Sequence, residues 1–542
     1  MSYFSLHAYD ADVWIRQFLG LRQQDESLNT DPQYATDVLN VETPNGVLQP
    51  HAGYKELSGS FTGRVETLAR FYRRWYDGAG SNNWMVCATG GKLYYRQEGG
   101  SSWMEIRRSA QADPFASDVW SWCTYEINQT GVDHPVDVLI MSNAEDGMIL
   151  LSPPDRPTTW NDELEFTWAD VKSTTESNVT TTYTWEDTLS PVWTINTVDT
   201  NGKKFGIIER YAERIWGGAI PGDPDMLVYS APYDPTDWEA NTEIPEDGAG
   251  SIQQPSWDGD SFTALKAFGD QLIAFKEHRV WRVYGTNPGE YTFSQQFGGG
   301  APFFNTIAVD VEKIYMADIN GLSVYDGMSV TPYARKLIEP LWRKINRNAM
   351  DQMCGVLFQN KYYLAVPMGT STVNNAMIVL NLEEQTILYY DDMKIESMLG
   401  TYDYIYATSS TTPGKIYMMN YNSWVTGKAS GGATRWVSPW MDFGYKRIQK
   451  GGFDLYMTPE VQDTEVTLSI SIQTEKKTKT KEYTISPLTE AQREADKEHR
   501  NKKLHFGGSG RRFRIIIETA EGVTAPWRLV GGLQLVVETD PD

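Results

Sequence analysis

The 542-residue sequence is poor in cysteine and histidine, the residues from which disulfide frameworks and zinc sites are built. The cysteines lie too far apart in sequence to form a CxxC pair, so we expect buried thiols in a protein made in a reducing cytosol. The histidines are equally scattered and form no HExxH pair, so we predict no zinc site. These residues are Cys87, Cys123, Cys354, His7, His51, His134, His278, His499 and His505.

Long apolar runs and the common catalytic motifs are also missing. No apolar stretch approaches the roughly 20 residues that span a bilayer, so we expect no membrane span. The opening MSYFSLHAYDADVW has neither a basic region nor an apolar core, so we expect no secretory signal. GxSxG, GxxxxGK[ST], a GxGxxG after a strand and the EF-hand loop are absent. The sequence therefore predicts no enzyme, no cofactor and no metal.

Positive charge is scarce, and the shortage is confined to one part of the chain. There are 48 Lys and Arg against 71 Asp and Glu, which gives a net charge of −23. From residue 441 onward we count 16 basic and 16 acidic residues, so the whole acidic surplus belongs to the first 440 residues. A body with this surplus repels nucleic acid and does not bind it through phosphate contacts.

Helical patterns are rare, whereas β-hairpin patterns fill most of the chain. Between residues 82 and 424, apolar or alternating runs are joined by Gly, Asn or Asp turns, as in WMVCATGGKLYYRQ from Trp84 and FGDQLIAFKEHRVWRVYG from Phe268. These units recur about every 40 to 60 residues, the spacing of four-stranded blades. We therefore predict an all-β fold with a β-propeller of six or seven blades, because ring closure hides sheet edges. Stacked β-sandwiches are the alternative.

Three segments follow from this pattern. Residues 1–80 are expected to lead into the propeller and close it, and residues 81–425 to form its body. The small, flexible stretch GKASGGATR marks a boundary. Strictly alternating strands follow it, so residues 426–542 are expected to form a C-terminal β-sandwich-like domain.

Two segments depart from the β pattern. YARKLIEPLWRKINRN, from Tyr333, has apolar residues at helical spacing, which predicts a short amphipathic helix with Pro340 in its first turn or at a kink. Residues 487–503 are charged with almost no apolar face. We expect a solvated helix or a long loop there, inserted between two strands of the C-terminal domain.

Two acidic turns, GDPD at 222–225 and WDGD at 257–260, are candidates for paired catalytic carboxylates. Acidic turns rich in Gly and Pro are, however, the ordinary joints of β-proteins. The aspartate-box repeat of sialidase-like propellers is absent, and no EF-hand pattern supports calcium. We therefore predict that both are structural turns.

The KEHR stretch around His278 and GGSG at 507–510 are the remaining candidates. His278 has no Ser or Cys nucleophile nearby in sequence, so we predict a solvated hairpin turn. GGSG precedes Arg511 and Arg512 and then a strand rather than a helix, so we predict a turn and not a phosphate site. We predict no catalytic, cofactor-binding or metal-binding residue. The charged neighbours of His278 are Lys276, Glu277 and Arg279.

Several stretches resemble virion proteins of tailed bacteriophages, and together they cover nearly the whole chain. In the first of them an Asn-Val pair is followed by a Gly-x-Leu-x-Pro-x-x-Gly-Tyr run, and the second contains Ser-Ala-Pro-x-Asp-Pro-x-x-Trp. The stretches are LNTDPQYATDVLNVETPNGVLQPHAGYKEL from Leu28, MLVYSAPYDPTDWEAN from Met226, SFTALKAFGDQLIAFKEHRVWRVYG from Ser261, VTPYARKLIEPLWRKI from Val330, and RWVSPWMDFGYKRIQKGGFDLYM with ISIQTEKKTK in the closing domain.

The resemblance is to tail hub or nozzle proteins of these phages. It implies a structural virion protein with a β-propeller body, in a homo-oligomeric ring, commonly of six copies, around the channel through which genomic double-stranded DNA is ejected. It also implies contacts to tail adaptor or tube proteins and to fibres, spikes or a needle, in a tail assembled in the host bacterial cytoplasm. The acidic body is expected to line the channel, although the resemblance identifies no lining residue.

Two other functions are compatible with the same pattern. One is a baseplate or tail-tip protein of a longer-tailed phage. The other is a carbohydrate-binding or glycosidase propeller that acts on the host surface, for which activity on bacterial polysaccharide is the discriminating observation.

Overall fold

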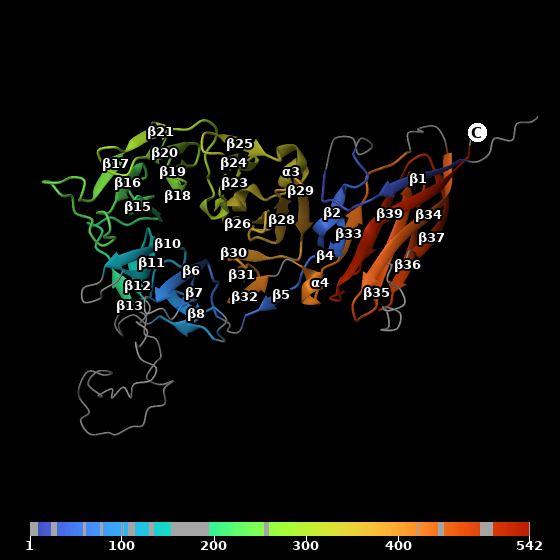
Figure 1. Cartoon of the computed structure of the whole chain (residues 1–542), viewed down its shortest axis with the longest axis horizontal. Helices are drawn as coiled ribbons and strands as arrows, with labels where there is room; N and C mark the ends of the chain where they lie inside the picture. The colour runs from blue at the N-terminus through green and yellow to red at the C-terminus, as the bar shows by residue number, and fades with distance from the viewer. Residues whose placement is uncertain are drawn as a thin grey trace, which may run out of the picture. The chain divides into compact units, whose positions relative to one another are not determined.

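The computed structural model describes residues 9–22, 30–57, 61–75, 80–98, 100, 102–106, 114–128, 135–152, 194–253, 259–419, 422–442, 449–487 and 502–540. The described chain is all-β and consists of many small antiparallel sheets (Figure 1). This confirms the all-β part of the predicted fold class. The chain divides into two compact units, one of residues 66–295 and one of residues 1–65 with 296–542.

The 66–295 unit contains four successive sheets, each with four strands in sequence order. The first sheet starts at Thr67, before the boundary at residue 81 drawn from the sequence, because β6 pairs with β7. The strands are β6 (Thr67–Trp75), β7 (Gly80–Thr89), β8 (Lys92–Gln97), β9 (Met104–Glu105), β10 (Ser121–Asn128), β11 (Pro135–Asn143), β12 (Gly147–Ser152), β13 (Thr194–Thr197), β14 (Ile207–Tyr211), β15 (Arg214–Gly218), β16 (Met226–Tyr229), β17 (Gly250–Gln253), β18 (Phe262–Phe268), β19 (Gln271–Lys276), β20 (Val280–Tyr284) and β21 (Thr292–Gln295).

The stretch FGDQLIAFKEHRVWRVYG shows how sequence alternation produces these sheets. Gly269 adopts a φ of 61° in the turn that joins β18 to β19, a conformation that glycine adopts without strain. β19 and β20 then pair antiparallel, with Leu272 opposite Val283 and both side chains buried. Of the KEHR residues, Lys276 ends β19, and Glu277, His278 and Arg279 form the turn between the strands. The predicted hairpin is therefore confirmed.

The second unit contains three further four-stranded sheets, and the last of them includes a strand from the N-terminal segment. β5 pairs with β32, so residues 54–56 complete the sheet of residues 395–419. The Tyr54 and Tyr417 rings, with centroids 4.3 Å apart, pack across this pair. The strands are β22 (Ala308–Val309), β23 (Ile314–Asp318), β24 (Gly321–Tyr325), β25 (Val330–Tyr333), β26 (Cys354–Phe358), β27 (Lys361–Val366), β28 (Ala376–Asn381), β29 (Thr386–Tyr390), β30 (Ile395–Gly400), β31 (Ile405–Ser409), β32 (Ile416–Met419) and β5 (Tyr54–Glu56).

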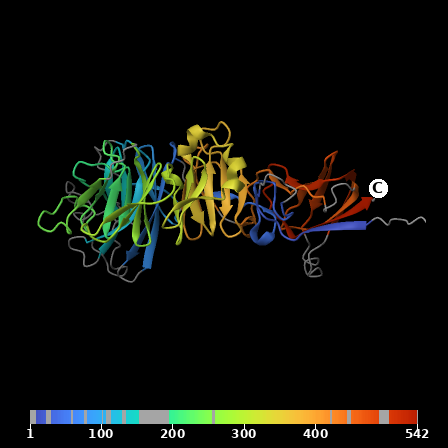
Figure 2. The ribbon, with the colours of Figure 1, turned by 90° about the horizontal axis from the view of Figure 1, so that it is seen from above.

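The same unit contains a further four-stranded sheet and a five-stranded sheet, here called the two-sheet region, which share one buried core. Figures 1 and 2 show β1, from the blue start of the chain, beside the red C-terminal strands. Their orders are β1-β39-β34-β37 and β2-β33-β38-β35-β36, and a short β3-β4 pair lies in the N-terminal segment. The strands are β1 (Tyr9–Ile15), β2 (Asp37–Leu39), β3 (Val41–Glu42), β4 (Gln49–Pro50), β33 (Thr434–Val437), β34 (Gln449–Val461), β35 (Val466–Thr474), β36 (Thr478–Ile485), β37 (Lys502–Gly510), β38 (Phe513–Thr519) and β39 (Trp527–Asp540).

The predicted amphipathic helix is present as α3 (Arg335–Trp342). It buries Ile338, Leu341 and Trp342 against the core of the second unit. Pro340 lies past the first turn, so the first of its two predicted positions is wrong, and the helix ends two residues later. The other helical segments are η2 (Pro44–Gly46), η3 (Phe304–Thr306), η4 (Arg347–Gln352) and α4 (Ser423–Thr426).

Two further predictions are settled, and one falls where the structure is not described. GGSG at 507–510 is the end of β37 and not a turn, because Lys450 and Gly451 of β34 pair with its last two residues. The cysteines are buried and free, as predicted, and burial raises the pKa of each thiol. Most of the charged segment 487–503 lies outside the described residues.

Candidate binding groove

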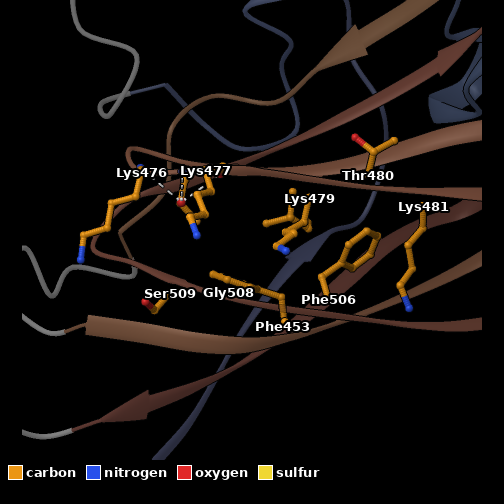
Figure 3. Close-up of a pocket in the computed structure, with 12 residues that line it drawn as sticks. Phe453, Lys476, Lys477, Lys479, Thr480, Lys481, Phe506, Gly508 and Ser509 are labelled. Atoms are coloured by element: carbon orange, nitrogen blue, oxygen red, sulfur yellow. Dashed lines mark hydrogen bonds between the residues drawn. The ribbon is translucent and has the colours of Figure 1, made fainter.

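One side of the two-sheet region opens into a groove of about 720 Å³. Figure 3 shows a row of four lysines along it, with Phe453 and Phe506 below them. The lysines come from the hairpin of β35 and β36 and from the turn that joins these strands. We call this site the lysine groove; its lysines are Lys476, Lys477, Lys479 and Lys481.

Strand register places two of these lysines on the core side of their sheet. Lys479 is paired with Ile472, and Lys481 with Ile470. Directly opposite residues of an antiparallel pair lie on the same face, and both isoleucines point into the core. Further along the same face of β36, Ile485 is buried. The inner face of this strand therefore changes from apolar to charged, which is where the groove begins.

The opposite wall of the groove comes from β37, where glycines leave the space open. A Cβ atom on Gly507 would meet no heavy atom within 4 Å, and one on Gly508 would lie 3.9 Å from Lys479 Cγ. β36 and β37 are each the last strand of their sheet among the described strands. The groove thus lies between two sheet edges, and lysine on an edge strand discourages uncontrolled strand pairing.

The four lysines of the groove form no ion pair with any described residue. The nearest carboxylate in sequence, Glu475, accepts hydrogen bonds from the backbone N–H groups of Arg511 (2.9 Å) and Arg512 (2.8 Å). Partial burial opposes ionisation of Glu475, but these N–H groups outweigh it and hold its pKa below the usual range. The turn after GGSG therefore binds an internal carboxylate, and the contact that the groove gives Lys481 is with the Phe506 ring (5.7 Å from Nζ to the centroid), so no described carboxylate neutralises the lysines.

The structure brings together two motifs that the sequence presents separately. Candidate ligand atoms of Asp260, Glu277 and His278 lie within 4.8 Å of one another. The backbone N–H of His278 donates to Asp260 Oδ1 (3.2 Å), and the ammonium group of the buried Lys276 donates to the Asp260 carbonyl (3.0 Å). Asp260 thus caps the KEHR turn, while Glu277 and His278 are exposed. This arrangement is that of a stabilised turn.

The other acidic motif, GDPD, forms the turn between β15 and β16. A backbone hydrogen bond joins it to the residues that follow WDGD. The N–H of Phe262 donates to the carbonyl of Pro224 (3.1 Å). Asp223 is exposed, and Asp225 is half-buried. Trp257 and Asp258 of WDGD lie outside the described residues.

We expect His278→Ala to change the free energy of unfolding by less than about 0.5 kcal/mol, because the side chain is exposed and the backbone bond to Asp260 remains. Trp281→Asp should instead lower it by about 3 kcal/mol, because this half-buried ring packs on Phe293 (centroids 5.6 Å apart) inside the sheet. Urea unfolding followed by circular dichroism measures both. If His278→Ala and Trp281→Asp lowered the free energy of unfolding equally, this would contradict a purely structural role for the hairpin.

Sequence reasoning missed a buried polar cluster in the second unit. His51 is 2% exposed, and its Nε2 lies 2.8 Å from Asp392 Oδ1 while its ring stacks on Tyr390. Burial favours the neutral imidazole, but Asp392 and then Glu42 outweigh it and raise the pKa of His51. Burial also raises the pKa of Glu42, whereas His51 lowers that of Asp392. Because 341 residues separate His51 from Asp392, no local motif could have revealed the pair.

Among the described residues, no helix has the length and apolar character needed to cross a membrane. No protein-family model and no curated protein matches the chain. Solved structures that it resembles include the extracellular domain of BT4673 from B. thetaiotaomicron, with a TM-score of 0.39, 8% identity, and coverage of 92% of this chain and 62% of that one. Another is PorZ, a surface component of the type-IX secretion system of Porphyromonas gingivalis, with a TM-score of 0.35, 9% identity, and coverage of 78% and 58%. The chain thus spans less than two thirds of either structure.

Proposed function

We propose that this chain is a structural virion protein of a tailed bacteriophage, a tail hub or nozzle that forms a ring around the DNA channel. The observation that carries the proposal is the series of phage-like stretches, and three of them cover complete structural elements. The stretch from Met226 is β16 and the loop after it, the stretch from Ser261 is β18 to β20, and the stretch from Val330 is β25 with α3. In these three stretches the resemblance therefore extends over complete elements.

The order of the small sheets supports a seven-bladed β-propeller as the body. Seven four-stranded sheets follow one another from β6 to β32, and six of them take all their strands in sequence order. The seventh takes its outer strand, β5, from the segment directly before β6. A chain that passes from the last sheet into the first is what ring closure of a propeller requires. In this proposal the two-sheet region is a β-sandwich attached to the ring.

The charge distribution supports passage of DNA without binding. Between Arg214 and Lys266 the sequence has ten acidic residues and no basic one. An acidic wall repels phosphate groups, so DNA slides past without forming tight contacts. We propose that the ring, of about six copies, faces adaptor or tube proteins on one side and fibres, spikes or a needle on the other.

Quantitative mass spectrometry of purified particles of the phage that encodes this chain tests the proposal. We expect the chain in the particles at a fixed low copy number, and electron microscopy should locate it at the tail. Its absence from particles would overturn the proposal. If the chain instead binds or cleaves the polysaccharide of the host surface and is not in the tail, the carbohydrate-active alternative is correct.

A further inference from the structure

The chain carries two unmatched surfaces of opposite charge. The first is the lysine groove. The second is the loop between β16 and β17, residues 233–247, here called the acidic loop, which has no basic residue. Its acidic side chains are all exposed and form no ion pair with any described residue. They are Asp234, Asp237, Glu239, Glu243, Glu246 and Asp247.

The acidic loop is held by its backbone and by two of its own acids, because Asp234 accepts from the N–H of Thr236 (2.8 Å) and Asp237 from that of Glu239 (2.9 Å), while all six acidic side chains remain exposed. The N–H of Ala231 donates to the carbonyl of Asp237, and that of Ala249 to the carbonyl of Glu239 (both 2.9 Å). Two apolar side chains on the loop, Tyr233 and Ile244, are 65% and 53% exposed. An ordered loop with outward acids and exposed apolar groups is a surface prepared for a partner, because little entropy is lost when it binds.

We infer that the lysine groove of one copy binds the acidic loop of a second copy of this chain. A lysine groove cannot pair with an identical groove, because like charges repel, so this contact is heterologous: one surface of each copy meets a different surface of the next. Heterologous contacts build rings when the rotation closes. The inference rests on, and deepens, the ring assembly of the proposed function, and it names the two surfaces that join its copies.

The groove fits a protein segment better than a nucleic acid. Lys479 and Lys481 are two residues apart on one strand, which spaces them by roughly 7 Å. Asp237 and Glu239 are also two residues apart in sequence, lie on either side of the buried Trp238 and are both exposed, so the loop offers carboxylates in a close pair. A chain with a net charge of −23 repels a polyanion at long range, whereas the acidic loop is fixed to the neighbouring copy and arrives with it.

Sedimentation velocity of the full chain tests this contact at about 0.05 M and about 0.5 M salt, where screening differs strongly. We expect wild-type chains to associate at low salt and to separate at high salt. Lys479→Gln with Lys481→Gln, and separately Glu239→Gln with Glu243→Gln, should each weaken association by about tenfold or more. The control, Lys344→Gln with Lys428→Gln, changes two exposed lysines outside the groove and should associate like the wild type.

Mixing the two defective variants identifies the heterologous geometry. The groove variant retains its acidic loop, and the loop variant retains its groove, so a mixture has one intact contact per pair. We expect a species of two copies that neither variant forms alone and that grows no further. A wild-type chain that stays monomeric at low salt, or a mixture that stays monomeric, overturns the inference.

Binding of a labelled single-stranded DNA of about 20 nucleotides, measured for the wild type and the groove variant, distinguishes a nucleic-acid site from the proposed contact between copies. If the groove variant loses DNA binding while its self-association equals that of the wild type, the groove is a nucleic-acid site and the inference is wrong.

Failure of this contact can also be distinguished from failure of the proposed function. If the chain associates in a salt-sensitive way but is absent from phage particles, only the proposed function is wrong. If the chain is present in particles but does not associate in this way, only the proposed contact is wrong.

Discussion

Replacing Arg214 with methionine is expected to lower the free energy of unfolding of the 66–295 unit by about 3–5 kcal/mol. The side chain is 1% exposed, and its Nη1 donates to the carbonyls of Ser230 and Gly248 (both 2.7 Å). Nη2 donates to the carbonyl of Glu246. Methionine fills the space of the stem but has no donor, so these carbonyls lose a charged partner inside the protein, where water replaces it poorly.

The same change should release the acidic loop, because Arg214 binds the carbonyls of Ser230 before it, Gly248 after it and Glu246 within it. Hydrogen exchange measured by mass spectrometry should increase for residues 230–249 of Arg214→Met. Arg210→Met is the matched control: its side chain is 39% exposed, and its ion pair with Glu213 (3.1 Å) contributes at most about 1 kcal/mol. Unchanged exchange in the loop, with a loss below about 1 kcal/mol, would show that Arg214 does not organise it.

Sequence reasoning succeeds for strands whose partners are adjacent in sequence and stops at partners that lie far away in the chain. Alternation of apolar residues predicted the hairpin of β19 and β20, because a period of two indicates a strand wherever its partner is adjacent in sequence. The same pattern says nothing about partners far away. Val13 of β1 lies opposite Leu535 of β39, and β5 lies beside β32. The predicted segment boundaries consequently left the N-terminal strands out of the C-terminal region.

The lysine groove illustrates a second limit. The stretch TEKKTKTKEY is visibly basic, but the face of the sheet on which its lysines lie depends on strand register. The pairing of Lys479 with Ile472 places that lysine on the core face. A shift of one residue would turn the same lysines to the outer face and leave no groove. GGSG at 507–510 was predicted as a turn for a related reason, since its pairing with β34 involves residues about 60 positions earlier. Register, rather than composition, creates this site.

Replacing Asp392 with asparagine should have the second large effect, a loss of about 3 kcal/mol near pH 6, because it leaves the buried His51 without its anionic partner. The imidazole is fixed from both sides: Nε2 bonds Asp392, and Nδ1 lies 3.0 Å from the carbonyl of Ala52. Asparagine keeps the shape of the side chain and removes its charge. The loss therefore reports the charge of the pair and not the packing around it.

The pH dependence of this pair has a definite sign in the wild type. The folded state raises the pKa of His51, so its contribution is fully present below the unfolded value of about 6.5 and is lost as the pH rises through the folded value. The pKa of Asp392 is lowered, so its contribution is present above about 3.9 and is lost as the pH falls through the folded value. Glu42, whose pKa is raised by burial, changes in the same direction as His51. We therefore expect the His51–Asp392 pair to stabilise the unit most between about pH 4 and 6.5, whereas the contribution of Glu42 is fully present only below about pH 4.3.

In Asp392→Asn the sign for His51 should reverse. Without the carboxylate, burial outweighs the smaller effect of Glu42 and lowers the pKa of the imidazole, so its contribution is gained as the pH rises through 6.5. The stability difference between wild type and variant should then narrow from about pH 5.5 to 7.5, by at most about 1.4 kcal/mol per pH unit. Calorimetry of both proteins, with hydrogen exchange of residues 40–52 to identify the transition, measures this difference. A difference that stays constant across this range would show that His51 is neutral in the folded wild type, and that its contact with Asp392 is an uncharged hydrogen bond.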